Sequence, residues 1–124
     1  MLSNEDNMGL EKSISVKEAI EILSINGHGI LTVDAAKQIC ISIEVPFDQK
    51  LIIRWKSQED AFKRFGFFAN LQGPDIGVDC LRLLYYITDK LGSGHPGSKF
   101  IGRGYQADEN IRVITHFLRT NGKL

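Results

Sequence analysis

Apolar residues near the start of the chain recur at the spacing of a helix. Those on the shared face are Val16, Ala19, Ile20 and Leu23. Ser15 and Glu18 have the spacing of a capping box, and residues 26–27 (Asn-Gly) can take the positive φ that ends a helix. We therefore expect a helix over residues 16–25, preceded by a disordered or frayed segment over residues 1–13.

The next apolar stretch alternates with a period of two. Its alternating members are Ile39, Ile41, Ile43 and Val45. Strict alternation of β-branched side chains is typical of a strand with one buried face. A second alternating run follows a short linker that contains Pro46. The pattern therefore predicts a β-hairpin over residues 38–45 and 51–56, with a weaker third strand over residues 29–33.

The same stretch also permits a helix. Thr32 can cap a helix over VDAAKQICIS, and Ala36 precedes Cys40 by the four residues found in helix-turn-helix domains. A recognition helix would then have to pass through Pro46, which removes a backbone donor and clashes with the preceding turn. The hairpin is therefore favoured, and the helix-turn-helix is the alternative.

Three helices are predicted in the second half of the chain. Ser57 caps a helix over residues 58–70, whose apolar members are Ala61, Phe62, Phe65, Phe68 and Ala69. Pro74 and Asp75 open a second helix that runs to residue 91. Its stripe is Ile76, Cys80, Leu83, Leu84, Ile87 and Leu91. Asp108 caps the last helix, and residues 121–122 (Asn-Gly) end it. The stripe of this last helix is Ile111, Ile114 and Leu118.

This order of elements predicts an α+β fold. It consists of an N-terminal helix, a small antiparallel β-hairpin or three-stranded sheet, and three C-terminal helices packed on one sheet face. Residues 14–124 are expected to form a single globular domain. Strands and helices do not alternate as βαβ units, which excludes a doubly wound nucleotide-binding fold.

Composition limits the classes of function. The chain has 124 residues, of which 43% are apolar, and its 15 Lys and Arg balance its 15 Asp and Glu. This balance argues against a protein that binds nucleic acid by net charge alone. Cys40 and Cys80 lie in apolar runs, and the three histidines are far apart, so we expect no disulfide, metal or cofactor. Without a signal peptide or membrane span, the expected location is cytoplasmic, with no membrane partner.

A glycine-rich stretch over residues 92–107 is the candidate anion or nucleic-acid site. Lys99 and Arg103 can pair with an anion, Tyr105 can stack on a ring, and His95 titrates near neutral pH. Arg112 and Arg119 extend this positive surface along the last helix. The glycines follow a helix rather than a strand, so they are not a nucleotide fingerprint. The alternative is a plain connector between two helices.

Aromatic side chains that fall off the helical stripes are candidates for protein contact. These are Phe67 and the pair Tyr85 and Tyr86, of which only one can face the core. His116 is expected at the core or its boundary, and His28 in a turn. The first functional hypothesis is a small non-catalytic binding or regulatory protein acting through a protein partner or as a homodimer. The alternatives are a nucleic-acid or anion binder, and an enzyme acting on a phosphorylated or carboxylated small molecule through His95.

Overall fold

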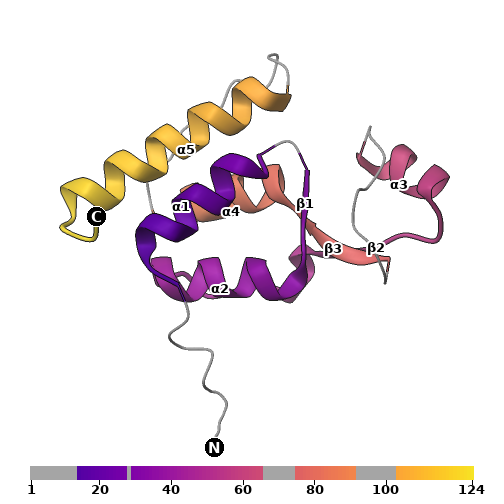
Figure 1. Ribbon diagram of the computed structural model, residues 1–124, viewed down its shortest axis with the longest axis horizontal. Helices are drawn as coiled ribbons and strands as arrows, with labels where there is room; N and C mark the ends of the chain where they lie inside the picture. Colours follow the sequence, from indigo (N-terminus) through magenta and orange to yellow (C-terminus); the bar gives the residue numbers. More distant parts are fainter. Residues whose placement is uncertain (1–13, 28, 66–74, 92–102) are drawn as a thin grey trace, which may run out of the picture.

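The fold is α+β, as the pattern predicts. The computed structural model describes residues 14–27, 29–65, 75–91 and 103–124, and these contain five α-helices and a three-stranded antiparallel sheet (Figure 1). In chain order the elements are α1 (Val16–Ile25), β1 (Ile30–Leu31), α2 (Val33–Ile43), the 3-10 helix η2 (Gln49–Leu51), β2 (Ile52–Arg54), α3 (Gln58–Phe65), β3 (Ile76–Asp79), α4 (Cys80–Lys90) and α5 (Arg103–Thr120).

The sheet has the order β1-β3-β2, so the last strand in sequence is the central one. Val78 of β3 is opposite Leu31 on one side and Ile52 on the other. The strands expected over residues 29–33 and 51–56 are present as the two edges but are shorter than predicted, at Ile30–Leu31 and Ile52–Arg54. β3 was not expected, because residues 76–79 were assigned to the start of the following helix. That helix instead begins at Cys80, where the Asp79 side chain accepts a hydrogen bond from the Leu81 amide.

The predicted strand over residues 38–45 is wrong, because this stretch forms α2. The Thr32 hydroxyl caps α2 by accepting from the Ala35 amide at 3.1 Å. Of the alternating residues, Ile41 is 43% exposed. The buried face of α2 is instead Ala36, Ile39, Cys40 and Ile43, which follow the helical i, i+3, i+4, i+7 spacing. Ile39 and Ile43 therefore fit both periods, whereas Ile41 fits only the alternating one, and the cap at Thr32 indicates the period that forms.

α2 stops in time to avoid Pro46. Glu44 takes the left-handed conformation with φ 67°, and its amide donates to the Ile41 carbonyl. The Val45 amide donates to the Cys40 carbonyl at 2.9 Å, which completes a Schellman motif around a non-glycine residue. No recognition helix follows in residues 45–54, where the structure has only η2 before β2. The helix of the alternative prediction is thus present, but the helix-turn-helix is not.

Three of the other predicted helix ends are confirmed, and one is wrong. The Ser15–Glu18 capping box of α1 and the cap of α3 by the Ser57 hydroxyl are confirmed. The end of α5 at residues 121–122 is confirmed, with Gly122 at φ 73°. The predicted cap at Asp108 is wrong, since α5 begins at Arg103. Tertiary packing explains the extra turn, because Gln106 and Ala107 are both buried.

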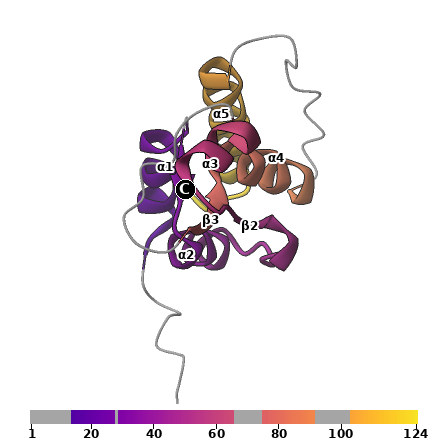
Figure 2. The same ribbon diagram turned by 90° about the vertical axis from the view of Figure 1, so that its right-hand side faces the viewer.

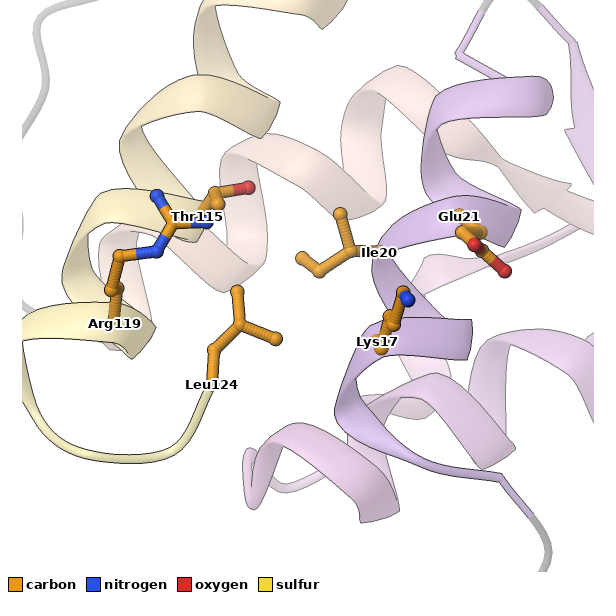
Figure 3. Close-up of a pocket in the computed structure, with 6 residues that line it drawn as sticks. All are labelled: Lys17, Ile20, Glu21, Thr115, Arg119 and Leu124. Atoms are coloured by element: carbon orange, nitrogen blue, oxygen red, sulfur yellow. The ribbon is translucent and has the colours of Figure 1, made fainter.

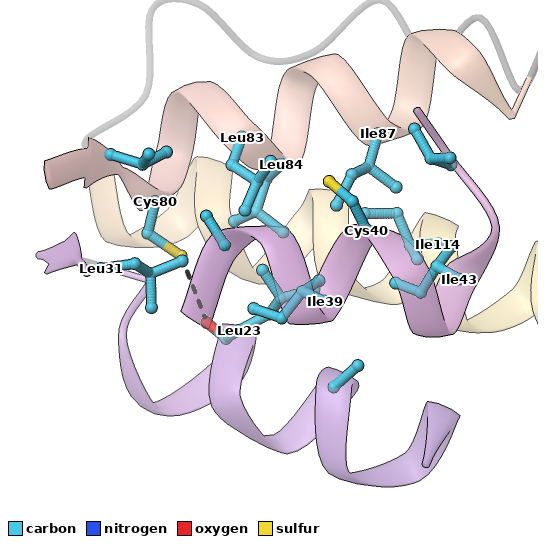
Figure 4. Packing of buried hydrophobic residues seen from close by; sticks show 14 of the residues in the cluster. Leu23, Leu31, Ile39, Cys40, Ile43, Cys80, Leu83, Leu84, Ile87 and Ile114 are labelled. Atoms are coloured by element: carbon cyan, nitrogen blue, oxygen red, sulfur yellow. Dashed lines mark hydrogen bonds between the residues drawn. The ribbon is translucent and has the colours of Figure 1, made fainter. Parts of the chain in front are cut away.

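The main core lies chiefly between helices α1, α2, α4 and α5 (Figure 4). Its largest fully buried side chains include Leu23, Ile39, Ile43, Leu83, Leu84, Ile87, Ile114 and Leu118. The helical stripes predicted for the last two helices supply most of these. This packing does not confirm the expected layer of three C-terminal helices on one sheet face.

A second, smaller cluster lies at one end of the molecule, where α3 stands beyond the sheet (Figure 1, Figure 2). It consists of Ile30, Trp55 and Ala61, with Ile53 packed against them. Phe62 was expected in the core of this helix but is 48% exposed. Residues 66–70 of the predicted helix, including Phe68 and Ala69, lie outside the described residues. None of the helices that the structure describes is both long and apolar enough to cross a bilayer.

Candidate functional site: a groove between the first and last helices

The residues of the predicted anion site do not all lie in one loop. Arg103 and Tyr105 belong to the first turn of α5, so the connector expected over residues 92–107 is wrong for its last five residues. His95 and Lys99 lie outside the described residues, as do His28 and Phe67. The anion-binding roles of these residues stay predictions.

Arg112 and Arg119 do lie on one face of α5, at a seven-residue spacing. His116 lies between them and is exposed, so its expected place at the core boundary is wrong. The Arg112 guanidinium already pairs with the Glu109 carboxylate at 2.5 Å. Asp108 is exposed on the same helix. This ridge therefore carries both signs of charge, with Asp108 and Glu109 before the cations in sequence.

Tyr85 and Tyr86 both pack against the main core as half-buried side chains, so the expectation that only one could do so is wrong. The Tyr85 hydroxyl donates to the Gln106 side-chain oxygen, and the Tyr86 hydroxyl donates to the Pro46 carbonyl. Burial, assisted by the Asp48 carboxylate, raises the pKa of Tyr86, which keeps its hydroxyl protonated as a donor. Contacts within the chain thus bury part of each ring, and both hydroxyl groups are hydrogen-bonded.

The buried polar groups between α4 and α5 are structural. The Thr88 hydroxyl is 2.8 Å from the Leu84 carbonyl and 3.0 Å from the Asn110 side-chain oxygen. The Asn110 amide nitrogen donates to the Gln106 carbonyl at 2.8 Å. These bonds satisfy side chains that would otherwise be costly to bury. They tie α4 to α5 and satisfy hydrogen-bonding groups of Thr88 and Asn110 within the chain.

The thiols do not form a reactive site. Cys40 and Cys80 are free and buried, and burial raises the pKa of Cys40 to about 11. The Cys80 sulfur lies 3.8 Å from the Leu23 carbonyl (Figure 4). Within the described ranges, His, Cys, Asp and Glu side chains form no group of three or more that could hold a metal ion.

A surface groove of about 320 Å³ lies between α1 and α5 (Figure 3). Its lining residues are Lys17, Ile20, Glu21, Thr115, Arg119 and Leu124. Ile20 and Leu124 point into the space between the two helices, and Arg119 stands on the α5 side. Lys17 and Glu21 stand on the α1 side. The result is an apolar floor with charged walls.

The two helices are close at one end and open at the other. A Cβ placed on Gly27, just after α1, would lie 3.0 Å from the Cβ of Ala107 in α5. Glycine and alanine at this point let the helices approach closely. The groove opens at the opposite end of the same pair, where Lys17 lies across from Arg119. Small residues at one end and larger ones at the other thus set its shape.

The turn after α5 brings Leu124 to the groove. The Lys123 amide donates to the Leu118 carbonyl at 2.8 Å, and the Gly122 amide donates to the Arg119 carbonyl at 3.2 Å. These two bonds form a Schellman motif. The Lys123 ammonium then pairs with the Glu44 carboxylate of α2 at 2.6 Å. The tail is thereby tied to α2, with Leu124 beside α1.

The charges of the groove are free to meet a partner. Among the described residues, Lys17, Glu21 and Arg119 form neither an ion pair nor a side-chain hydrogen bond within the chain. An apolar floor with charged walls suits contact with a protein side chain.

Of the groove residues, only Arg119 was a candidate in the sequence. Ile20 was assigned to the core stripe, and no pattern indicated that Leu124 would return to α1. The sequence does carry one signal for a contact on this helix: Ile25 lies on the polar side of α1, where an aliphatic side chain stays exposed. The chain matches no family model, no curated protein and no solved structure.

Proposed function

We propose that this chain is a small, non-catalytic, cytoplasmic binding or regulatory protein that acts through protein–protein contact at the α1/α5 groove. The observation that carries the proposal is the apolar floor of Ile20 and Leu124 between side chains of both charges. An aliphatic side chain of a partner would cover this floor, and its polar neighbours would pair with Lys17, Glu21 or Arg119.

The nucleic-acid alternative has weaker support in the described residues. Its cations on α5 share their ridge with Asp108 and Glu109, and Arg112 is paired. Of the groove's lining residues, none is aromatic, so a base would find no ring on which to stack. Retention on heparin that falls steeply with salt would favour this alternative over the protein-binding function.

The groove can be tested by blocking it without disturbing the core. We suggest selecting peptides from a random display library on the full chain, then measuring their affinity for the variant Leu124→Arg. Leu124 follows the end of α5 and is 40% exposed, so the substitution fills the groove with a charged side chain and leaves the helices intact. Ile41→Arg, on the exposed face of α2, is the matched control.

The proposal predicts that selected peptides lose at least about tenfold in affinity for Leu124→Arg. They should retain their affinity for Ile41→Arg. Peptides that bind wild type and both variants equally would show that the groove is not the contact site. Repeated selections that yield no peptide above background would also show that the groove is not a protein-contact site.

A further inference from the structure

Ile25 is an aliphatic side chain that the described part of the chain leaves largely exposed. It lies in the last turn of α1 and is 79% exposed, the highest value among the large hydrophobic residues of the described chain. It follows Glu21 by four residues and Lys17 by eight, which places all three on the solvent side of α1. An exposed apolar residue therefore projects from the same helix that forms one wall of the groove.

We propose that the partner of the groove is a second copy of this chain, bound so that Ile25 of each copy enters the α1/α5 groove of the other. This inference rests on the proposed function and names its partner. In a two-fold symmetric dimer the same surface serves both subunits, and every contact occurs twice. If the two α1 helices lie antiparallel about an axis near Glu21, Ile25 of one copy lies beside Lys17 and Ile20 of the other.

The charges on α1 are arranged for such a pairing. In the antiparallel arrangement the two Glu21 carboxylates face each other at the axis, and Lys17 of each copy lies one helical turn from Glu21 of both copies. Each carboxylate at the centre then has a cation from each copy nearby. Arg119 stands on the far wall, where it is close to the backbone carbonyls that end the other copy's α1.

A second copy fits this surface better than a nucleic acid. One face of α1 holds both the projecting residue and the wall of its receiving groove, and its Lys17 and Glu21 cancel in charge. A phosphate backbone would be repelled by Glu21 and would leave Ile25 uncovered. Self-complementarity of shape and charge is the property that an isologous interface requires.

Sedimentation of the full chain over concentrations up to about 1 mM tests the proposal, because an interface anchored by one aliphatic residue per subunit is weak. Wild type should shift from monomer to dimer with rising concentration. Ile25→Lys should raise the dissociation constant at least about tenfold. Ile41→Lys is the control, since Ile41 is also an exposed isoleucine near the end of a helix, and it should leave the dissociation constant unchanged.

A charge exchange tests the register. Lys17→Glu places four carboxylates at the interface and Glu21→Lys places four ammonium groups there, so each variant should dissociate the dimer. The double variant Lys17→Glu/Glu21→Lys restores opposite charges and should recover most of the wild-type affinity. Recovery is the sharper result, because a variant that merely damages α1 would not regain association when a second substitution is added.

The outcomes separate this inference from the proposed function. A wild-type chain that stays monomeric at about 1 mM overturns the dimer, and peptides that need an open groove would still support protein binding. A dimer that is insensitive to Ile25→Lys also overturns the inference, because another surface would then be responsible. A dimer that weakens with both Ile25→Lys and Leu124→Arg supports the inference and the proposed function together.

Discussion

The main core and the cluster around Trp55 differ in how extensively their described side chains are buried. In the main core, helices α1, α2, α4 and α5 each contribute fully buried side chains, and the last helix closes over the first. Among the side chains that the structure describes, the Trp55 cluster has three buried members, and Ala61 is the one that comes from α3. α3 has good local signals, including the Ser57 cap and an Asp60 carboxylate that accepts from the Lys56 amide at 2.8 Å.

This difference shows that a helix can have strong local signals while few of its described side chains are buried. Caps determine where α3 begins, but they bury little apolar surface. Phe62 of α3 remains 48% exposed although it has the spacing of a core residue. The main core and α3 should therefore open with different free energies.

Truncation of a side chain in each region should have the largest and most contrasting effects. Leu83→Ala removes a fully buried side chain from the main core and should cost about 3 kcal/mol of unfolding free energy. Trp55→Ala should instead release α3 locally. Hydrogen exchange should then accelerate in the amides of α3, with little change in α4 and α5, whereas Leu83→Ala should accelerate exchange throughout. Uniform acceleration in Trp55→Ala would show that the two regions form one cooperative unit.

Smaller changes in stability, of opposite sign, are expected when Gly27 and Gly29 are each replaced by alanine. Gly27→Ala places a methyl group 3.0 Å from the Ala107 Cβ and should destabilise the chain by about 1 kcal/mol through overpacking of α1 against α5. Gly29→Ala meets nothing closer than 4.0 Å and should stabilise it by roughly 0.5 kcal/mol, because the unfolded chain loses conformational freedom. Denaturant unfolding measures both. Equal effects at the two positions would contradict the close helix contact.

The smallest effect concerns the pair of Lys123 with Glu44, which ties the tail to the outside of the main core. The hydrogen bond and charge of Lys123 lower the pKa of Glu44. Any stability from this pair is therefore present above the ordinary pKa of Glu44 and is lost as the pH falls through the lowered value. Lys123→Met should be slightly less stable than wild type at pH 7, and the two should converge once the pH has fallen below the lowered pKa of Glu44. A difference that persists at acid pH would assign the effect to packing instead.

Much of the fold could be predicted because local signals and helical periods agree. The cap of α1, the stripes of α4 and α5 and both edge strands follow directly from residue patterns. α2 could not be settled in this way, because Ile39 and Ile43 fit both periods and the alternating pattern competes with the cap at Thr32. β3 was missed because four residues between a proline and a helix cap carry too short a pattern.

The candidate site was harder to predict than the fold. A groove is a property of two helices that meet across the whole length of the chain, and no spacing within either helix reveals it. Ile20 and Leu124 come together only because the Schellman turn at Gly122 redirects the tail. Charged residues such as Lys17 and Arg119 look like ordinary solvated positions until the opposite wall is known.

The place of β3 at the centre of the sheet also determines when this chain can fold. Ile30 of β1 pairs with Asp79 of β3, and α1 packs against α5 as well as against its neighbour α2. During synthesis, α1 and α2 can therefore contact each other early, but their surfaces that pack against later elements leave the ribosome uncovered. Contacts between such distant segments require large loops to close, which slows the search for the native state. The nascent chain thus stays open to chaperones, and to other nascent copies of itself, until its last helix has been made.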